Sequence, residues 1–391
     1  MRRIELDLVL NKILSTHPRI SDINFTVGRP CQVAVDGKLR PALFSLAANE
    51  LTAFHTEQIA LALIDNDRRL LTNLFRHGSC DLSYNIQDGL RFRVNIFSQR
   101  GVLSIVMRLL TNRIPSIDEL GLPESFKSMA RERNGIILFT GATGTGKTTS
   151  LATILNEIND NFPLHIITLE DPIEYLHTHK NATFNQRELG KDFDSFANGL
   201  RASLRQAPNV ILVGEIRDRE TIEIAFNAAE TGHLVFSTLH TISAGHTINR
   251  ILGMFDTEEE RQVRFRLADS LRWVVGQRLL PKAGGGRIAV FEAMQNNVRV
   301  KDSIINGESE GKTFYEIIDA GQAYQMHTFD QDIIKIFSQG FIDEDTAMTY
   351  ASNRSKVRIG IDQIKSKKGE KTSDIEGLRI DKDWGIFNKK E

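Results

Sequence analysis

Cysteine is nearly absent from this chain: only Cys31 and Cys80 occur among its 391 residues. The two are far apart in the sequence and no Cys-x-x-Cys pair exists, which excludes a thiolate zinc site of the usual spacing. So few cysteines also predict no disulfide framework, which favours a reducing compartment. The first residues, Met1 to Asp7, carry acids where a signal peptide has its apolar core, so we expect no signal peptide.

An excess of one charge is lacking too, because 49 Lys and Arg residues are balanced by 50 Asp and Glu residues. This balance gives no overall attraction to nucleic acid or to an anionic membrane. No basic stretch studded with aromatic residues is present, which argues against direct nucleic-acid binding. No apolar run approaches the roughly 20 residues that a transmembrane helix needs. We therefore expect a cytoplasmic protein that reaches a membrane only through partners.

The remaining composition is that of a globular protein, with 41% hydrophobic and 25% charged residues. The length predicts two or three domains, at roughly 100–200 residues per domain. Residues 1–110 mix helical periodicity with short strand-like runs, including a hairpin around Asp88-Gly89, and are predicted to form an α+β domain. Residues 111–122, which include Pro115, are predicted to be a linker.

Residues 123–355 have a different pattern, in which short apolar runs alternate with segments of helix length. This alternation predicts an α/β fold with a largely parallel sheet covered on both faces, typical of nucleotide-binding proteins. Residues 257–280 and 327–352 are predicted to be helical. Residues 356–391 are rich in charge and are expected to form a tail that is poorly ordered without a partner. The predicted strands of the sheet are residues 135–140, 165–169, 209–213 and 234–238.

Residues 141–148 read Gly-Ala-Thr-Gly-Thr-Gly-Lys-Thr, a complete phosphate-binding loop between a predicted strand and a predicted helix. Its glycines let the backbone amides face phosphate groups, and the helix N-terminus adds positive potential. We expect Lys147 to neutralise the β- and γ-phosphates of ATP and the Thr148 hydroxyl to bind Mg²⁺. The predicted nucleotide-binding residues are Gly141, Ala142, Thr143, Gly144, Thr145, Gly146, Lys147, Thr148 and Thr149.

Two glutamates end apolar strands, and the carboxyl ends of parallel strands are where such sheets bind ligands. Glu215 follows the run that starts at Val210 and is expected to act on Mg²⁺ through water. Glu170 follows the run that starts at Ile166 and is expected to activate the attacking water. The sequence leaves open which glutamate serves the metal and which the water. Acids at strand ends also commonly cap a helix or pair with arginine.

His233 and His240 flank a further apolar run. Imidazole donates hydrogen bonds readily near neutral pH, so both are candidates to sense or stabilise the γ-phosphate. The alternative for each is a packed or surface histidine.

Four ordered segments together resemble the PilT/PilU family of type IV pilus retraction ATPases, within the secretion ATPase superfamily. Residues 141–150 resemble its Walker A motif, and residues 169–177 resemble its Asp box. Residues 211–219 resemble its atypical Walker B motif, with glycine before glutamate, and residues 229–241 resemble its His box. The resemblance covers about residues 1–355.

The resemblance implies a PAS-like N-terminal domain, a RecA-like ATPase domain and a homo-hexamer with nucleotide between subunits. In such rings arginines from a neighbouring surface reach the phosphates, and Arg91 and Arg93 match positions of that kind. An arginine there would stabilise charge that develops on the transferred phosphoryl group. The alternative for each is a surface salt bridge.

The function implied is an ATP-hydrolysing motor that retracts a type IV pilus and drives twitching motility. It would act at the cytoplasmic inner-membrane base of the pilus machine, on a platform protein. The segment from Val298 to Ile304 departs from the Ala-Ile-Arg-Asn-Leu-like motif of the retraction ATPases, and other segments resemble PilU more than PilT. The alternatives are therefore an accessory, PilU-like regulatory ATPase that works with a paralogous retraction ATPase, and a secretion or conjugation ATPase.

Overall fold

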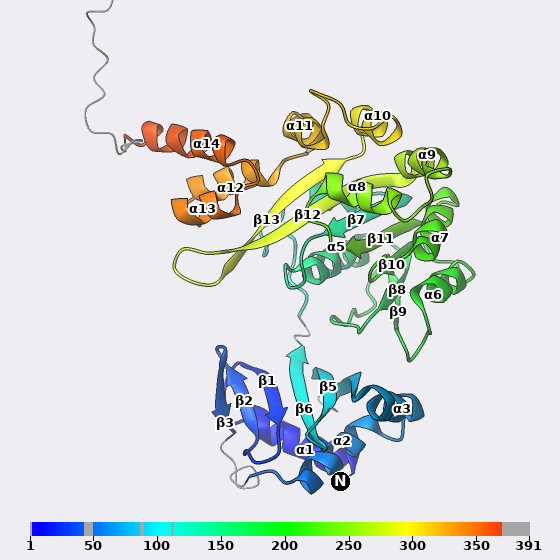
Figure 1. Cartoon of the computed structure of the whole chain (residues 1–391), viewed down its shortest axis with the longest axis vertical. Coiled ribbons are helices and arrows are strands. Elements are labelled where there is room, and N and C mark those ends of the chain that lie inside the picture. The colour runs from blue at the N-terminus through cyan, green and yellow to red at the C-terminus, as the bar shows by residue number, and fades with distance from the viewer. Residues whose placement is uncertain (1, 43–49, 87–89, 111–112, 370–391) are drawn as a thin grey trace, which may run out of the picture. The chain divides into compact units, whose positions relative to one another are not determined.

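The computed structural model describes residues 2–42, 50–86, 90–110 and 113–369 (Figure 1). Three predicted features lie at least partly outside these residues. They are the turn at Asp88-Gly89, residues 111–112 of the linker and the end of the tail. The chain divides into two compact units. The first falls within Met1–Phe139, Lys147–Leu239 and Asn249–Trp273, and the second within Thr140–Gly146, His240–Ile248 and Val274–Glu391.

The first sheet has six strands in the order β3-β2-β1-β6-β5-β4, and its neighbouring strands are antiparallel. Alternation along β5 places Phe92, Val94 and Ile96 in the core, where each is 0% exposed. The predicted mixture of helices and antiparallel strands is confirmed. The strands are β1 (Ile20–Phe25), β2 (Gln32–Val35), β3 (Lys38–Pro41), β4 (Ser79–Asn85), β5 (Arg91–Gln99) and β6 (Val102–Leu110), and the helices are α1 (Arg3–Leu14), α2 (Ala53–Ile64) and α3 (Arg68–His77).

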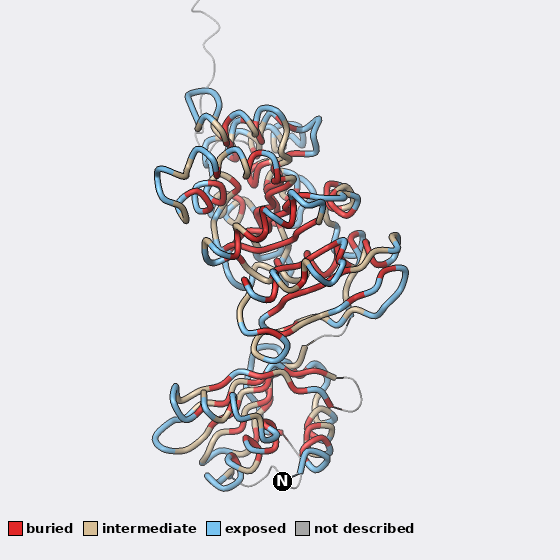
Figure 2. Tube along the Cα trace, turned by 90° about the vertical axis from the view of Figure 1, so that its right-hand side faces the viewer, coloured by how far each residue is buried: buried red, intermediate tan, exposed pale blue. Residues whose placement is uncertain are grey.

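The second sheet has seven strands in the order β13-β12-β7-β11-β10-β8-β9. Strands β11, β10, β8 and β9 are parallel, as predicted. Every residue of β7, β10 and β11 is buried, as expected for strands covered on both faces. Across the chain, buried residues follow the strands and exposed residues gather in loops (Figure 2). The strands are β7 (Gly135–Thr140), β8 (His165–Glu170), β9 (Thr183–Glu188), β10 (Val210–Val213), β11 (Leu234–Leu239), β12 (Leu271–Pro281) and β13 (Arg287–Gln295).

Helices connect the strands of this sheet, and the molecule therefore has a mixed α/β fold. Helix α5 follows β7, α6 and α7 precede and follow β10, and α8 follows β11. Among the described residues, no helix combines the length and the apolar character needed to cross a membrane. The helices are α4 (Ser125–Met129), α5 (Lys147–Asn161), α6 (Phe196–Ser203), α7 (Arg219–Glu230), α8 (Ala244–Leu252) and α9 (Glu260–Ser270).

The predicted helix over residues 257–280 is wrong in its second half, because α9 ends at Ser270 and β12 begins at once. Trp273, Val274 and Val275 are at most 1% exposed. Aromatic and β-branched residues favour a strand where both faces are buried.

The C-terminal helices also differ from the prediction. The expected helix over residues 327–352 is divided near Gly340, whose φ of +75° favours glycine. The expected tail forms helix α14 up to Lys367, because Val357 and Ile361 lie one turn apart and are fully buried against α12. The elements are α10 (Val298–Asn306), α11 (Phe314–Asp319), the short 3₁₀ helix η1 (Gln322–Tyr324), α12 (Phe329–Ser338), α13 (Glu344–Tyr350) and α14 (Arg354–Lys367).

Candidate active site

The phosphate loop connects the end of β7 to the first residue of α5, as the motif requires. Gly141, Gly144 and Gly146 have φ values of +146°, +80° and +91°. Residues with a side chain rarely adopt these values. A Cβ atom on Gly141 would also lie 2.4 Å from the carbonyl oxygen of Gln277. The loop therefore needs glycine for its own path and for the close approach of β12.

The remaining residues of the loop differ in exposure. Ala142, Thr143 and Gly144 are exposed. The Thr145 hydroxyl donates to the Ala142 carbonyl at 2.9 Å and closes the turn. Exposed backbone that precedes a helix N-terminus is an arrangement suited to phosphate binding.

Lys147 begins α5 and is only 7% exposed. Burial lowers the pKa of its ammonium group, and the charges of Glu215 and Glu174 oppose that shift. Lys147 and Glu215, both predicted site residues, are thus close enough to interact. Glu174 lies within the segment that resembles the Asp box, but sequence reasoning gave this residue no role.

Glu215 follows β10 after Gly214, whose amide donates to the Leu169 carbonyl at 2.8 Å. This bond ties the ends of β10 and β8 together, so Glu215 and Glu170 follow neighbouring strands at the same edge of the sheet. The Glu215 side chain is 13% exposed and forms an ion pair with Arg217.

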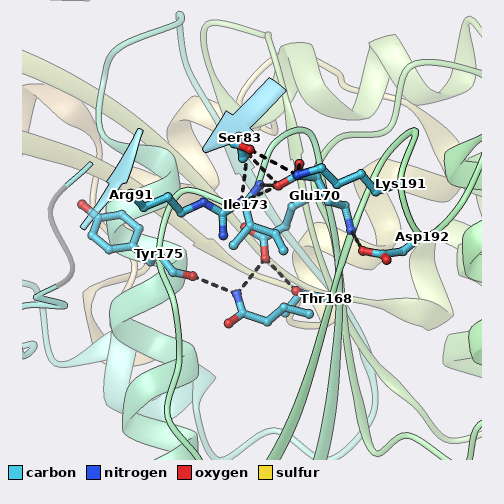
Figure 3. A network of polar contacts seen from close by, with 10 residues as sticks. Ser83, Arg91, Thr168, Glu170, Ile173, Tyr175, Lys191 and Asp192 are labelled. Carbon is cyan, nitrogen blue, oxygen red and sulfur yellow. Dashed lines mark hydrogen bonds and ion pairs between the residues drawn. The ribbon is translucent and has the colours of Figure 1, made fainter. Parts of the chain in front are cut away.

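Glu170 is the last residue of β8 and is 8% exposed. Its Oε1 accepts hydrogen bonds from Thr168 Oγ1 at 2.6 Å and from Gln186 Nε2 at 3.2 Å (Figure 3). Burial raises the pKa of Glu170 to about 7, although both donors favour the charged form. A carboxylate that changes its protonation near neutral pH is suited to accept a proton from water.

Strand β9 brings a second carboxylate beside this one, since Glu188 is in register with Glu170. Glu188 forms an ion pair with Arg91 of β5 and accepts from Ser83 Oγ of β4 at 2.9 Å (Figure 3). Its carboxylate also accepts from the Ile173 amide at 3.3 Å. Sequence reasoning missed Gln186 and Glu188, because β9 reads Thr-Phe-Asn-Gln-Arg-Glu and has little apolar periodicity.

The two predicted arginines have different surroundings. The Arg91 side chain is 6% exposed and is held by Glu188 and Ser83. Arg93 is exposed, two residues along the same face of β5. Burial raises the pKa of Asp171, the residue that follows β8, and the positive charge of Arg93 is the largest effect that lowers it. Arg93 therefore lies near the end of β8.

The two predicted histidines lie at opposite ends of β11. His240 is exposed and directly follows the strand. The next amide, of Thr241, donates to Thr140 Oγ1 at 3.0 Å, and Thr140 precedes the phosphate loop.

His233 precedes the strand, and its carbonyl accepts from the amide of Gly135, where β7 begins, at 3.0 Å. Its Nδ1 lies 3.0 Å from the Ala228 carbonyl. At about 3.3 Å per residue, β7 separates this end from the loop by more than 15 Å. His233 therefore lies at the end of β11 away from the phosphate loop of its own chain, and its role at the γ-phosphate stays a prediction.

The oxygen donors at the loop fit Mg²⁺. The Thr148 hydroxyl lies in the first turn of α5, and the Glu215 carboxylate interacts with the adjacent Lys147. Within the part of the chain that the structure describes, no group of three or more His, Cys, Asp or Glu side chains forms a metal cage. Magnesium commonly takes one or two protein oxygens and completes its shell with phosphate and water, so these donors suit Mg²⁺ that arrives with a nucleotide.

Known proteins resemble most of this chain. Residues 72–343 match the family model described as type II/IV secretion system protein. The chain is 36% identical over 342 residues to the type IV pilus ATPase PilU of Pseudomonas aeruginosa, with 87% of each chain covered. It is 37% identical over 329 residues to the type IV pilus retractation ATPase PilT of the same organism, which covers 84% of this chain and 93% of that protein.

A solved structure supports the same relationship. The crystal structure of the pilus retraction motor PilT with bound ADP has a TM-score of 0.80 and 38% identity to this chain. The match covers 90% of this chain and 98% of that one.

Proposed function

This chain belongs to the type II/IV secretion system protein family, and we propose that it is the ATP-hydrolysing motor of type IV pilus retraction and twitching motility. The chain is an ATPase of this family. The observation that carries the proposal is a complete phosphate loop, residues 141–148, together with a buried carboxylate at Glu170. Similarity to a retraction ATPase across 93% of that protein's length supports retraction, rather than extension, of the pilus.

The site residues divide the work of hydrolysis. Backbone amides of residues 141–149 and the Lys147 ammonium bind the phosphates. The Thr148 hydroxyl and, through water, the Glu215 carboxylate would hold Mg²⁺, which would neutralise charge on the phosphate oxygens. Glu170 accepts a proton from the attacking water, and His240 donates a hydrogen bond to the γ-phosphate.

Arg93 is the better candidate for an arginine that reaches nucleotide on a neighbouring subunit. It is exposed, whereas Arg91 is buried against Glu188 of its own chain. This assignment requires an assembly, and we propose a homo-hexamer with nucleotide between subunits. An arginine supplied in this way stabilises charge developing on the phosphoryl group.

The domain organisation we propose is PAS-like for residues 1–110 and RecA-like for residues 123–355, joined by residues 111–122. The antiparallel first sheet and the parallel strands of the second sheet support this division. ATP binding would close the two domains on each other, and hydrolysis with release would open them. The motion would pass to a platform protein at the cytoplasmic face of the inner membrane, where the motor would be peripheral.

An accessory role is the second candidate. The identity of 36% to PilU over 87% of both chains is close to the identity with PilT. An accessory, regulatory ATPase would work beside a paralogous retraction ATPase. A secretion or conjugation ATPase is a further alternative, and the family model's description as a type II/IV secretion system protein supports a secretion role.

Deletion of the gene in its host, with pilus length and twitching scored, tests the direction of movement. Hyperpiliation with lost motility is the expected result. Loss of pili would indicate extension instead. Normal pili with normal motility would indicate an accessory or secretion role.

A further inference from the structure

We propose that Thr168 and Gln186 are positioning residues that anchor Glu170 through its Oε1 atom and so reserve Oε2 for the proton of the attacking water. This inference rests on the proposed role of Glu170 as the base. Neither residue belongs to the phosphate loop or to the metal donors.

Both anchoring donors converge on one oxygen. Thr168 Oγ1 lies 2.6 Å from Oε1 of Glu170, and Gln186 Nε2 lies 3.2 Å from the same atom. A carboxylate oxygen offers two lone pairs, so these bonds occupy Oε1. No hydrogen bond from the described residues reaches Oε2. The two oxygens of one carboxylate are thereby made different.

The Gln186 amide has its own orientation fixed by the loop that follows β8. Its Nε2 also donates to the Tyr175 carbonyl at 2.8 Å, and its Oε1 accepts from the His177 amide at 2.8 Å. Both protons of the amide nitrogen and the amide oxygen are used, so the side chain cannot turn without loss of three hydrogen bonds.

The same loop reaches the phosphate side of the site. The Tyr175 hydroxyl lies 2.9 Å from Thr149 Oγ1, in the first turn of α5. The loop that fixes Gln186 is therefore hydrogen-bonded to the helix that follows the phosphate loop. A base fixed in this way needs no reorganisation when water attacks.

The reaction step assigns each bond and proton. The oxygen of the water forms a bond to the γ-phosphorus while the bond from that phosphorus to the bridging oxygen breaks. ADP takes the bonding electron pair, and one proton of the water passes to Oε2 of Glu170. The product is inorganic phosphate, and the proton later returns to solvent.

Charged groups around Glu170 set the direction of the expected pH effect. Glu174 favours the protonated form, and Arg91, reaching from β5, favours the charged form. Thr168 and Gln186 also favour the charged form, so removal of either donor raises the pKa of Glu170 from about 7. A base works only when deprotonated, so activity rises as the pH passes upward through this pKa.

The test compares Thr168→Val and Gln186→Leu with the parent in the full chain. The acid limb of the pH profile of ATP hydrolysis should move to higher pH by about one pH unit in each variant. A second readout needs no turnover: dicyclohexylcarbodiimide labels protonated carboxyl groups in apolar surroundings, and mass spectrometry measures labelling of Glu170 against pH. The labelling midpoint should move in the same direction and by a similar amount.

Thr221→Val is the matched control, because Thr221 is 1% exposed and its hydroxyl has no hydrogen-bond partner among the described residues. Its pH profile and labelling should equal those of the parent. Unchanged midpoints in both test variants, with Glu170→Gln inactive, would overturn the positioning roles and leave Glu170 as the base. An active Glu170→Gln variant would instead overturn the proposed base itself.

Discussion

Arg91 and Glu188 form a buried ion pair in which each side chain is only 6% exposed, although 97 residues separate them in the sequence. Burial alone would raise the pKa of Glu188, but hydrogen bonds from Lys191 and Ser83 and the charge of Arg91 hold it below the usual value. Glu188 therefore stays charged, and loss of Arg91 would leave its carboxylate buried without its closest positive partner.

Replacement of Arg91 by Ala should destabilise the protein by about 2 kcal/mol, because the buried Glu188 carboxylate loses a charged hydrogen-bond donor, although Lys191 still pairs with it. Chemical denaturation at neutral pH measures this change. Arg93→Ala is the control, since an exposed arginine should change the free energy of unfolding by less than about 0.5 kcal/mol. If Arg91→Ala were as stable as Arg93→Ala, the ion pair would not stabilise the fold.

Gly141→Ala should lose nucleotide binding. The new Cβ would lie 2.4 Å from the Gln277 carbonyl oxygen, and φ of +146° is strained for alanine. Binding of a fluorescent ATP analogue measures the loss. Gly284→Ala is the matched control, because Gly284 also has a positive φ, of +84°, but open space around it. Equal affinities of the two variants would refute the close approach of β12.

Glu215→Gln should retain ATP binding but hydrolyse ATP about 10²–10³ times more slowly, because a group that stabilises the transition state is weakened. Titration with Mg²⁺ should show a weaker metal dependence in the variant. Hydrolysis at the parental rate, with the parental Mg²⁺ dependence, would remove Glu215 from the metal site.

The buried carboxyl group of Glu292 predicts a pH-dependent stability. It accepts from the Ala244 amide at 2.8 Å, and burial raises its pKa to about 7. A raised pKa means that the folded protein binds the proton more tightly than the unfolded chain, so this contribution to stability is lost as pH rises through 7. Glu292→Gln should therefore gain about 2 kcal/mol relative to the parent between pH 5 and pH 8.

Thermal unfolding at several pH values measures this difference. Exposed Glu310→Gln is the control and should follow the parent at every pH. A stability difference for Glu292→Gln that did not depend on pH would contradict the raised pKa.

Local sequence patterns predicted the phosphate loop and strands β7, β8, β10 and β11 of the second sheet, but not β9, β12 or β13. Lys147 was predicted from a glycine motif, and Glu170 was predicted from an apolar run. Each residue lies within a few residues of the pattern that marks it. The same reasoning failed over β12, where the apolar run at Trp273 suits a buried helix or a buried strand, and only packing decides between them.

The residues that contact the predicted site residues could not themselves be predicted, because tertiary structure brings them together. Gln186 and Glu188 lie on a polar strand with no periodic signal. Arg91 was predicted to reach nucleotide on a neighbouring subunit, and its ion pair with Glu188 was not predicted. His233 and His240 flank the same apolar run, so a strand over that run places them at its opposite ends.

ATP turnover by the purified Glu170→Gln variant tests the central claim most directly. The exchange keeps the size of the side chain and removes the proton acceptor, so ATP should bind as in the parent while turnover falls by about 10³. Lys147→Ala, measured alongside, should lose both ATP binding and turnover. Parental turnover in Glu170→Gln would contradict the account of this chain as a motor whose hydrolysis depends on the buried carboxylate.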